Sequence, residues 1–413
     1  MANKITKQPE IRFKGFNNDW EQRKLSEVLK VSKEKNKDNG FDKNDVLSVS
    51  REYGTVNQIE YQGRSFAGAD VSNYKVVKEN DLIYTKSPLK GAPYGIFQNA
   101  TINGIISPLY AVYHSTEIAY APYVSIYLKN DNIATHYLSP LVSKGAKNTI
   151  NVTDEGALEG KIFFPNVLEQ RKISGFFKSL DDTIALQNCK LEEMQLYKKA
   201  MLQKMFPKNG EKVPEIRFDG FTDDWEQRKL GAISERVTRK NKDLESTLPL
   251  TISAQYGLVD QITYFNKQIA SKDVSNYYLL EKGEFAYNKS YSKDYPWGAV
   301  KRLDNYDKGV LSTLYIVFKP TDVDSNFLVS YYDTDNWHRE VSMRAAEGAR
   351  NHGLLNITAN DFFDTDLTIP TNNNEQQKIG AFFKSLDDAI ALQNNKLNKL
   401  KEMKKALLQK MFV

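Results

Sequence analysis

The sequence has few of the residues that build metal and redox sites. It contains one cysteine, Cys189, among 413 residues, which excludes a disulfide framework and a cysteine-based zinc site. Its four histidines are scattered, and no two of them have the spacing of metal ligands. We therefore predict no metal site and expect the histidines to be surface residues or hydrogen-bonded core residues.

Long hydrophobic runs are also missing. No apolar stretch approaches the ~18 residues that a membrane-spanning helix needs, and the mean hydropathy is −0.56. The first residues, Met-Ala-Asn-Lys-Ile-Thr-Lys, contain no apolar signal core. These features lead us to expect a soluble, cytoplasmic protein that does not bind a membrane.

The net charge is also small, because basic and acidic residues are nearly balanced. Lys and Arg number 57 against 52 Asp and Glu, a net charge of +5. A protein that binds nucleic acid non-specifically usually carries a larger basic excess. DNA binding by this chain would therefore depend on local patches. Hydrophobic residues make up 40% of the chain, which is enough to form hydrophobic cores, so we do not expect the chain to be disordered.

What the sequence does contain is a long internal repeat. PEIRFKGFNNDWEQRKLSEV at 9–28 returns as PEIRFDGFTDDWEQRKLGAI at 214–233, with 14 of 20 positions identical. The segment 176–206 returns at 382–412 with 22 of 31 positions identical. A period near 206 residues is too long for a solenoid, so a globular unit followed by a helix has been duplicated.

The two copies differ most in their interiors. LSVSREYGTVNQIEY from Leu47 matches LTISAQYGLVDQITY from Leu250, and DVSNY occurs in both copies, but after about residue 114 the middles barely align. Both copies are thus expected to share one structural role and to recognise different targets. We predict the domains 1–165, 166–213, 214–371 and 372–413: recognition domain, spacer helix with linker, recognition domain and spacer helix.

The globular parts have the composition of an α+β fold. Short β-branched and aromatic runs bounded by Gly, Asn, Asp and Pro predict strands. The predicted strands lie at 46–50, 75–84, 107–113, 125–130 and 160–165, and in the second copy at 248–253, 277–287, 311–318 and 365–370.

Each copy closes with a long amphipathic helix. Asn166 with Glu169, and Asn372 with Glu375, have the spacing of a capping box. Apolar residues then follow a 4-3 alternation over more than four heptads, which is typical of a coiled coil. The seam, which we also expect to be the partner interface, includes Ile173, Phe177, Leu180, Ile184, Leu191, Met194, Ile379, Phe383, Leu386, Ile390, Leu397 and Leu400.

The two helices are expected to pair with each other. Parallel, in-register pairing would set Lys198 against Lys404 in the seam, so the antiparallel arrangement is favoured, and it follows from a pseudo-twofold relation between the halves. The alternative is that each helix packs only on its own domain. A seam of this length would span about 50 Å.

Catalytic motifs are hard to find. GALEGK at 156–161 has one residue too few for a phosphate loop and no Ser or Thr after the lysine. SPLY at Ser107 is a near miss for a methyltransferase motif, and STLY at Ser312 suits a buried strand end better. The pairs Asp181-Asp182 and Asp387-Asp388 fit a solvated helix face. The sequence therefore predicts no catalytic site.

Basic and aromatic residues in the divergent interiors are the candidates for DNA contact. Cations neutralise phosphates, and Arg and Asn can read base edges in the major groove. The alternative is that these loops are ordinary turns whose aromatic residues cover a core. The candidates are Lys86, Ser87, Lys90, Tyr94, Lys144, Lys147, Asn148, Lys289, Ser290, Tyr291, Lys293, Tyr295, Arg344, Arg350 and Asn351.

Taken together, these motifs resemble a type I restriction–modification specificity subunit. The resemblance rests on PEIRFKGF…DWEQRKL and its repeat from Pro214, on FFP…LEQRKISGFF…LDDTIALQ with its repeat TIP…NEQQKIGAFF…LDDAIALQ, and on NDLIYTKS with GEFAYNKS. It covers essentially the whole chain.

The resemblance implies that each recognition domain reads one half of a bipartite DNA site and that the helices set the gap. It further implies two modification subunits that methylate adenine N6 with S-adenosylmethionine, and restriction subunits, which are motor-nucleases using ATP and magnesium. The chain itself would bind no cofactor and would not be an enzyme. The alternatives are a self-contained DNA methyltransferase and a coiled-coil adaptor without a DNA role.

Overall fold

The chain folds into two compact units. A computed structural model describes residues 6–51, 53–89, 91–144, 150–253, 256–267, 269–292, 294–345 and 354–413. Unit 1 comprises Met1–Asn188 and Lys396–Val413, and unit 2 comprises Cys189–Asn395. Each unit therefore takes a globular part and a portion of both long helices. The finer domain borders given above stay predictions.

The first half of the chain alternates short strands and short helices before its long helix. In order, the elements are β1 (Thr6–Lys7), β2 (Trp20–Lys24), α1 (Leu25–Val28), β3 (Lys30–Val31), η1 (Lys43–Asp45), β4 (Leu47–Ser50), β5 (Gly54–Asn57), α2 (Gln58–Gln62), β6 (Lys75–Val77), β7 (Leu82–Tyr84), β8 (Phe97–Asn99), β9 (Gly104–Ile106), β10 (Ala111–His114), α3 (Ala121–Tyr127), α4 (Asp131–Leu138), β11 (Ser143–Lys144), β12 (Ile150–Asn151), η3 (Gly156–Leu158), β13 (Lys161–Phe164) and α5 (Val167–Lys204).

The second half follows a closely related order. Its elements are β14 (Glu226–Lys229), α6 (Leu230–Ile233), β15 (Ser234–Arg236), β16 (Leu250–Ser253), β17 (Gly257–Asp260), α7 (Gln261–Phe265), β18 (Tyr278–Glu281), β19 (Phe285–Asn288), β20 (Ala299–Arg302), β21 (Lys308–Leu311), β22 (Ile316–Pro320), α8 (Ser325–Tyr332), α9 (His338–Arg344), α10 (Ala359–Phe363), β23 (Asp366–Ile369) and α11 (Asn373–Lys410).

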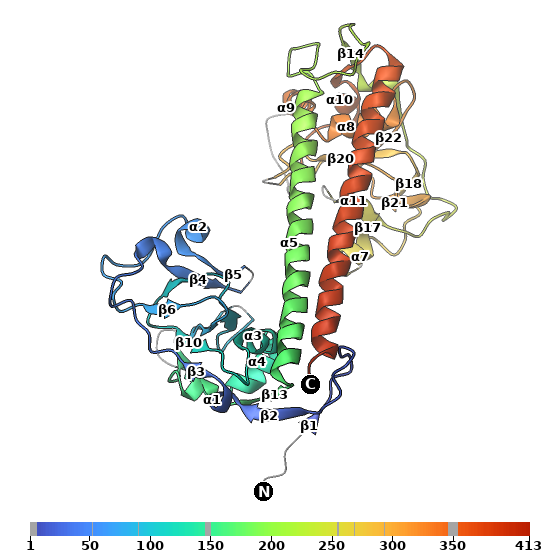
Figure 1. Ribbon diagram of the computed structural model, residues 1–413. Helices are drawn as coiled ribbons and strands as arrows, with labels where there is room; N and C mark the ends of the chain where they lie inside the picture. Colours follow the sequence, from blue (N-terminus) through green and yellow to red (C-terminus); the bar gives the residue numbers. More distant parts are fainter. Residues whose placement is uncertain are drawn as a thin grey trace. The chain divides into compact units, whose positions relative to one another are not determined.

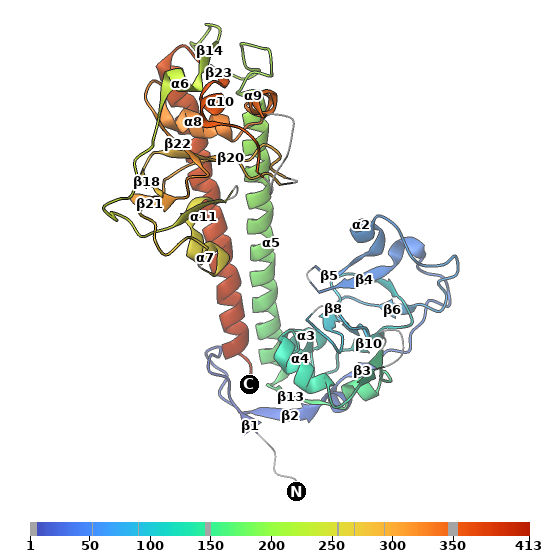
Figure 2. The ribbon, with the colours of Figure 1, turned by 180° about the vertical axis from the view of Figure 1, so that it is seen from behind.

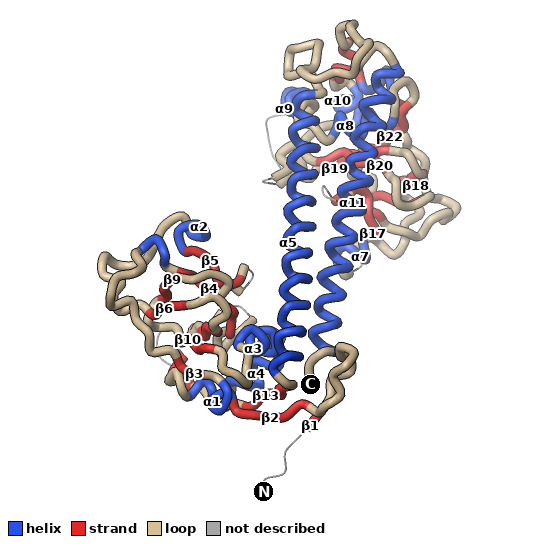
Figure 3. The backbone as a smooth tube through the Cα atoms, viewed as in Figure 1, coloured by secondary structure: helices blue, strands red, loops and turns tan. Residues whose placement is uncertain are grey.

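The same sheet recurs in both units. Unit 1 has the four-stranded order β3-β10-β7-β8, and unit 2 has β15-β22-β19-β20. The smaller pairs correspond as well, with β4-β5 and β6-β9 answered by β16-β17 and β18-β21. All these pairs are antiparallel. The predicted mixture of helices and strands is confirmed (Figure 3).

One predicted strand is wrong, and four others are corrected: 75–84 and 277–287 each contain two strands, while β10 and β22 begin only at Ala111 and Ile316, after turns within the predicted runs 107–113 and 311–318. Residues 125–130 span the end of α3 and the turn after it, where a strand was expected from the aromatic and β-branched residues. Pro122 lies in the first turn of α3, a position that favours helix initiation. Because α3 is buried almost all round, its sequence lacks the polar face that marks an amphipathic helix.

Two long helices dominate the ribbon, α5 in green and α11 in red (Figures 1 and 2). Each has 38 residues. The side chain of Asn166 accepts a 2.9 Å hydrogen bond from the Glu169 amide and so caps the start of α5. The second half of the predicted capping box is wrong, because the Glu169 carboxylate binds an arginine instead.

That arginine forms a buried ion pair repeated in both units. Nε and Nη2 of Arg12 donate to the Glu169 carboxylate at 2.7 and 2.8 Å. Arg217 donates to Glu375 in unit 2 at the same two distances. Both glutamates are almost fully buried. The bidentate pair fixes the opening segment of each copy to the first turn of its helix, which accounts for the identity of these segments.

The tip of the other copy's helix completes each core. In unit 1, Phe412 packs beside Trp20, Tyr123 and Phe177, with ring centroids 5.7 to 6.3 Å away. In unit 2, Phe206 packs beside Trp225 and Phe327 at 5.9 and 5.5 Å. The second-copy helix thus ends in unit 1, and the first-copy helix ends in unit 2.

Within each unit the two helices run in opposite directions. In unit 1, Phe177 lies against Phe412, and Asp181, one turn further along α5, pairs with Lys404. In unit 2, Lys198 pairs with Asp387 at 2.6 Å, and Phe206, further along α5, lies against Phe383, earlier on α11. Asp181 and Asp387 therefore neutralise the seam lysines, which corrects the prediction of a purely solvated face. Asp182 and Asp388, both 66% exposed, do face solvent.

The predicted seam residues are turned toward the interior of the chain. Seven of the twelve are buried and five are partly buried. The buried ones are Ile173, Phe177, Leu180, Leu191, Ile379, Phe383 and Leu397. The partly buried ones are Ile184, Met194, Leu386, Ile390 and Leu400.

Candidate nucleic-acid interface

Nine of the fifteen predicted contact residues belong to one hairpin segment in each unit. This hairpin joins β7 to β8 in unit 1 and β19 to β20 in unit 2. The Tyr84 hydroxyl donates to the Tyr94 carbonyl at 2.7 Å, and the Tyr287 hydroxyl donates to the Trp297 carbonyl at 2.9 Å. The acceptor follows the donor by ten positions in both units. The two hairpins thus have a common base beneath different loop sequences.

A glycine closes each hairpin in the left-handed backbone region. Gly95 has φ of +82° and Gly298 has φ of +81°. A Cβ atom would lie 2.9 Å from the Thr85 hydroxyl at Gly95 and 2.1 Å from the Asn288 carbonyl at Gly298. Only glycine combines this φ with the close approach, so these residues are required by the hairpin frame.

Lys86 is tied to its own unit. Its ammonium pairs with the Asp154 carboxylate, which also accepts from Lys75 at 2.5 Å. Burial works against the ionisation of Asp154, but the two lysines outweigh it and hold its pKa below the ordinary value. Lys86 therefore stabilises the hairpin base. The neighbouring Ser87 is exposed, and Tyr94 packs against the core.

The hairpin of unit 2 offers more exposed groups. Lys289 is half-buried, and its ammonium donates to the Ile357 carbonyl at 3.3 Å. Ser290 is exposed, and Tyr295 is 43% exposed. Tyr291 packs against the core, as the alternative interpretation of these loops expects.

Each hairpin is hydrogen-bonded to a residue that follows the second predicted contact loop in the sequence. The Ile150 amide donates to the Lys86 carbonyl at 3.3 Å, and the Leu355 amide donates to the Lys289 carbonyl at 2.9 Å. Ile150 follows the predicted loop of the first copy, and Leu355 follows that of the second. The candidates Lys90, Lys147, Asn148, Lys293, Arg350 and Asn351 lie outside the described residues, as does the side chain of Lys144, whose backbone belongs to β11.

Arg344 sits at the end of α9 and binds backbone and carboxylates of its own unit. It donates to the Asp364 carbonyl at 2.7 Å and pairs with Glu340. Its side chain is 19% exposed. This geometry favours a structural role. The prediction that Arg344 contacts DNA stays untested.

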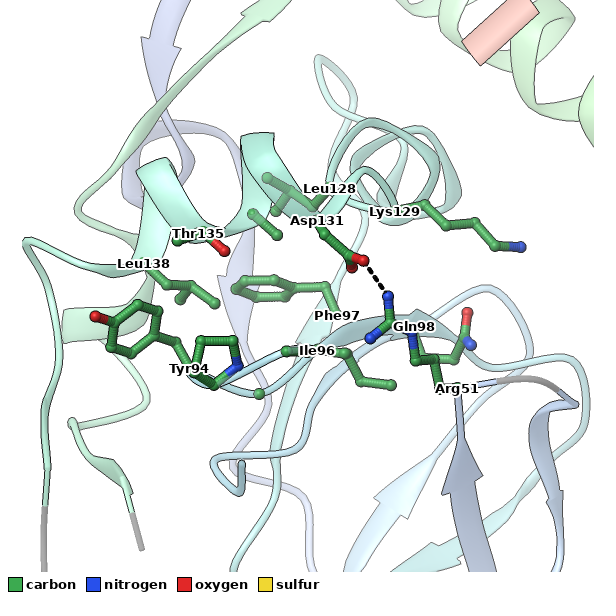
Figure 4. A pocket seen from close by; sticks show the side chains of 14 residues that line it. Arg51, Tyr94, Ile96, Phe97, Gln98, Leu128, Lys129, Asp131, Thr135 and Leu138 are labelled. Atoms are coloured by element: carbon green, nitrogen blue, oxygen red, sulfur yellow. Dashed lines mark hydrogen bonds and ion pairs between the residues drawn. The ribbon is translucent and has the colours of Figure 1, made fainter. Parts of the chain in front are cut away.

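A cavity of about 190 Å³ lies next to the hairpin of unit 1 (Figure 4). Phe97, Leu128 and Leu138 form an apolar part of its wall, and an ion pair between Arg51 and Asp131 lies at one side. Tyr94 lines it from the hairpin. Within the described ranges, no group of three or more His, Cys, Asp or Glu residues is arranged to hold a metal.

A charged cluster at the end of α8 distinguishes the two units. In unit 2, Asp333 binds Lys198 at 2.8 Å and Lys301 at 2.7 Å. Burial would raise the pKa of Asp333, but the two lysines lower it below its ordinary value. In unit 1, Lys129 stands at the corresponding place, six residues after the aromatic ring that packs on the tryptophan. Burial and the nearby Lys404 lower the pKa of Lys129.

Neither this cluster nor the surface tyrosines of β4–β5 were predicted from the sequence. The available signal was the position of Lys198, a charged residue, in the predicted seam. The STLY segment was misassigned: Leu314 is 57% exposed and the corresponding Leu109 is 76% exposed, so both segments are surface turns.

The second half of the chain is similar in sequence to a known protein family. Residues 222–402 match the family model described as the type I restriction modification DNA specificity domain. The resemblance to type I restriction–modification specificity subunits is confirmed. No curated protein was found to match the sequence. Of the helices in the described part of the chain, none is both long enough and apolar enough to cross a membrane.

Solved structures are similar over nearly the whole length of this chain. The type I specificity subunit from M. genitalium has a TM-score of 0.61 at 13% identity, covering 98% of this chain and 99% of that one. A chain from a study of assembly and conformational transition of the type I system gives 0.47 at 16%, covering 96% and 98%. The HsdS subunit from Thermoanaerobacter tengcongensis gives 0.43 at 17%, covering 95% and 96%. The first likeness shows the fold.

Proposed function

We propose that the chain is the non-catalytic DNA-recognition subunit of a type I restriction–modification complex. Each unit would read one half of an asymmetric, bipartite DNA site. The observation that carries the proposal is the pair of hairpins with one frame and two different loops. Matched tyrosines and glycines hold the base of each hairpin, while the loop residues differ. Similar frames with different loops suit two similar readers of different sequences.

The long helices would form an antiparallel coiled coil that sets the gap between the half-sites. Thirty-eight residues in each helix correspond to about 55 Å at the rise of an α-helix. One helical turn of DNA, the separation of two major-groove readers on one face, is about 34–36 Å. The opposite direction of the helices within each unit and the mutual neutralisation of Lys198 and Asp387 support this arrangement.

Two adenine-N6 methyltransferase subunits would dock on the helices, and restriction subunits would join them. Because the seam residues are turned inward, a partner subunit would have to contact other apolar side chains on the helices. Leu186 and Leu392 occupy corresponding positions in the repeat and are 66% and 72% exposed. Two equal docking points fit two equal partners. S-adenosylmethionine, ATP and magnesium would then be bound by these partners, and base flipping and methyl transfer would occur there.

The test is single-molecule sequencing of N6-methyladenine in host DNA with and without this chain. We expect one split, asymmetric motif to lose methylation when the chain is removed. Exchanging residues 234–365 for those of another specificity subunit should change one half of the motif and leave the other half intact. A continuous or palindromic motif, or a change in both halves, would contradict the proposal.

A further inference from the structure

A second surface, repeated in both units, consists of large side chains that are exposed to solvent. In unit 1 it comprises Tyr53, Tyr61, Arg64 and Phe66, and in unit 2 Tyr256, Tyr264, Lys267 and Ile269. We call it the tyrosine surface. It lies on the turn between β4 and β5 and around α2, and on the turn between β16 and β17 and around α7.

The exposure of these side chains is matched between the units. Tyr53 is 64% exposed and Tyr256 is 61% exposed. Tyr61 and Tyr264 are 45% and 47% exposed, and the apolar residue that follows is 59% exposed in unit 1 and 51% in unit 2. Burial in a core therefore does not account for keeping the same residue types after duplication.

The backbone beneath the surface is matched as well. The Ser50 hydroxyl accepts from the Tyr53 amide at 3.2 Å, and the Ser253 hydroxyl accepts from the Tyr256 amide at the same distance. Asn57 and Asp260 cap the two short helices through 2.9 Å bonds to the amides of Ile59 and Ile262. The two tyrosines are thus presented in the same way in each unit.

The tyrosine surface adjoins the proposed reading hairpin. The Gln98 side chain on β8 donates to the Ser50 carbonyl at 3.1 Å. Arg51, next to this carbonyl, lines the cavity of Figure 4 together with Tyr94 of the hairpin. In unit 2, β16 and β17 contact β20, the second strand of the hairpin. A ligand of the hairpin would therefore reach this surface.

We propose that the tyrosine surface binds the sugar–phosphate backbone of DNA independently of sequence. This inference rests on the proposed function. Two readers of different half-sites need different base contacts, whereas the backbone is the same at both. Tyrosine hydroxyls and the cation at position 64 or 267 are typical donors to phosphate. Each unit would then hold DNA by a shared surface and read it by its own loops.

The experiment measures DNA affinity of the full chain assembled with its methyltransferase subunits. Two duplexes are compared. One contains the motif identified by N6-methyladenine sequencing, and in the other the bases of that motif are scrambled. Arg64→Ala should weaken both duplexes by the same factor and reduce the slope of log affinity against log salt by about 0.9. Lys267→Ala should do the same. Lys212→Ala, which removes an equal charge from a 68% exposed site elsewhere, should leave the slope unchanged.

Tyrosine variants separate binding from packing. Tyr53→Phe with Tyr61→Phe keeps the rings, whose centroids lie 5.6 Å apart, and removes only the hydroxyls. We expect about tenfold weaker binding of both duplexes for two lost hydrogen bonds to phosphate, with an unchanged Tm. Tyr256→Phe with Tyr264→Phe should match it.

Three results would overturn the inference: unchanged affinity, a loss confined to the duplex with the motif, or intact DNA affinity with lost subunit assembly. If the wild-type complex does not distinguish the duplexes, the proposed function fails. Equal weakening by the variants would in that case still support the tyrosine surface.

Discussion

Units 1 and 2 share the parts that hold the helices and differ in the parts beside the hairpins. The buried pairs Arg12–Glu169 and Arg217–Glu375 have equal distances. Beside the hairpins, unit 2 has the neutral cluster of Lys198, Lys301, Asp333 and Asp387, whereas unit 1 has Lys129 and a cavity. A buried ion pair tolerates little change, so duplication preserved the frame and left the neighbourhood of the loops free to diverge.

The largest expected effect comes from the aromatic tips of the helices. Phe412→Ala should lower the free energy of unfolding of unit 1 by about 3–5 kcal/mol, because it leaves a hole among Trp20, Tyr123 and Phe177. Phe206→Ala should do the same to unit 2. Hydrogen exchange followed by mass spectrometry can read each unit separately. Leu168→Ala, at a 70% exposed position, is the control.

If either phenylalanine variant accelerated exchange equally in both units, the two cores would be one cooperative structure. The comparison between independently stabilised units would then fail. If Leu168→Ala had a comparable effect, the loss would come from the helix and not from the core.

A smaller effect is expected from the charged cluster of unit 2. Asp333→Asn leaves Lys198 and Lys301 with Asp387 alone and should destabilise unit 2 by about 2 kcal/mol. The pKa of Asp333 is lowered from its ordinary value of 3.8. The Asp333 carboxylate therefore stabilises unit 2 fully at pH values above 3.8, and this stabilisation is lost as pH falls through the lowered pKa. The variant should lack this part of the acid sensitivity. Chemical denaturation at pH 7 and pH 3 tests both points, and equal pH dependence of variant and wild type would contradict them.

The sequence could predict the frame but not these clusters. The duplication and the heptads indicated two similar domains and two long helices, since both signals are local or repetitive. Asp333 and Lys301, however, come from different elements and meet Lys198 only after folding. Lys86 was predicted to contact DNA from a loop, but its side chain pairs with Asp154, which lies 68 positions further along the chain. Tyr53 and Tyr256 were visible in the repeat, and only their exposure sets them apart from core tyrosines such as Tyr84.

The smallest effect, and the one of opposite sign, is expected at Lys129 in unit 1. Its pKa is lowered by burial and by Lys404, so the charged form is disfavoured in the folded state. Lys129→Met should therefore stabilise unit 1 slightly at pH 7. Because the side chain is 40% exposed and lies 3.5 Å from Asp181, the gain should not exceed about 0.5 kcal/mol.

The same shift gives the pH dependence of this site. Because the pKa of Lys129 is lowered in the folded state, its charged form destabilises unit 1 fully at pH values below the folded pKa. This destabilisation is relieved as pH rises toward 10.5, the ordinary pKa of lysine. The free energy of unfolding of the wild type, measured by chemical denaturation, should therefore rise relative to that of Lys129→Met between pH 7 and pH 10. Lys178→Met, at a 71% exposed position on α5, serves as the control. A loss of 1 kcal/mol or more in Lys129→Met would mean that Lys129 and Asp181 form a stabilising pair, and that the charged clusters of the two units are alike in effect.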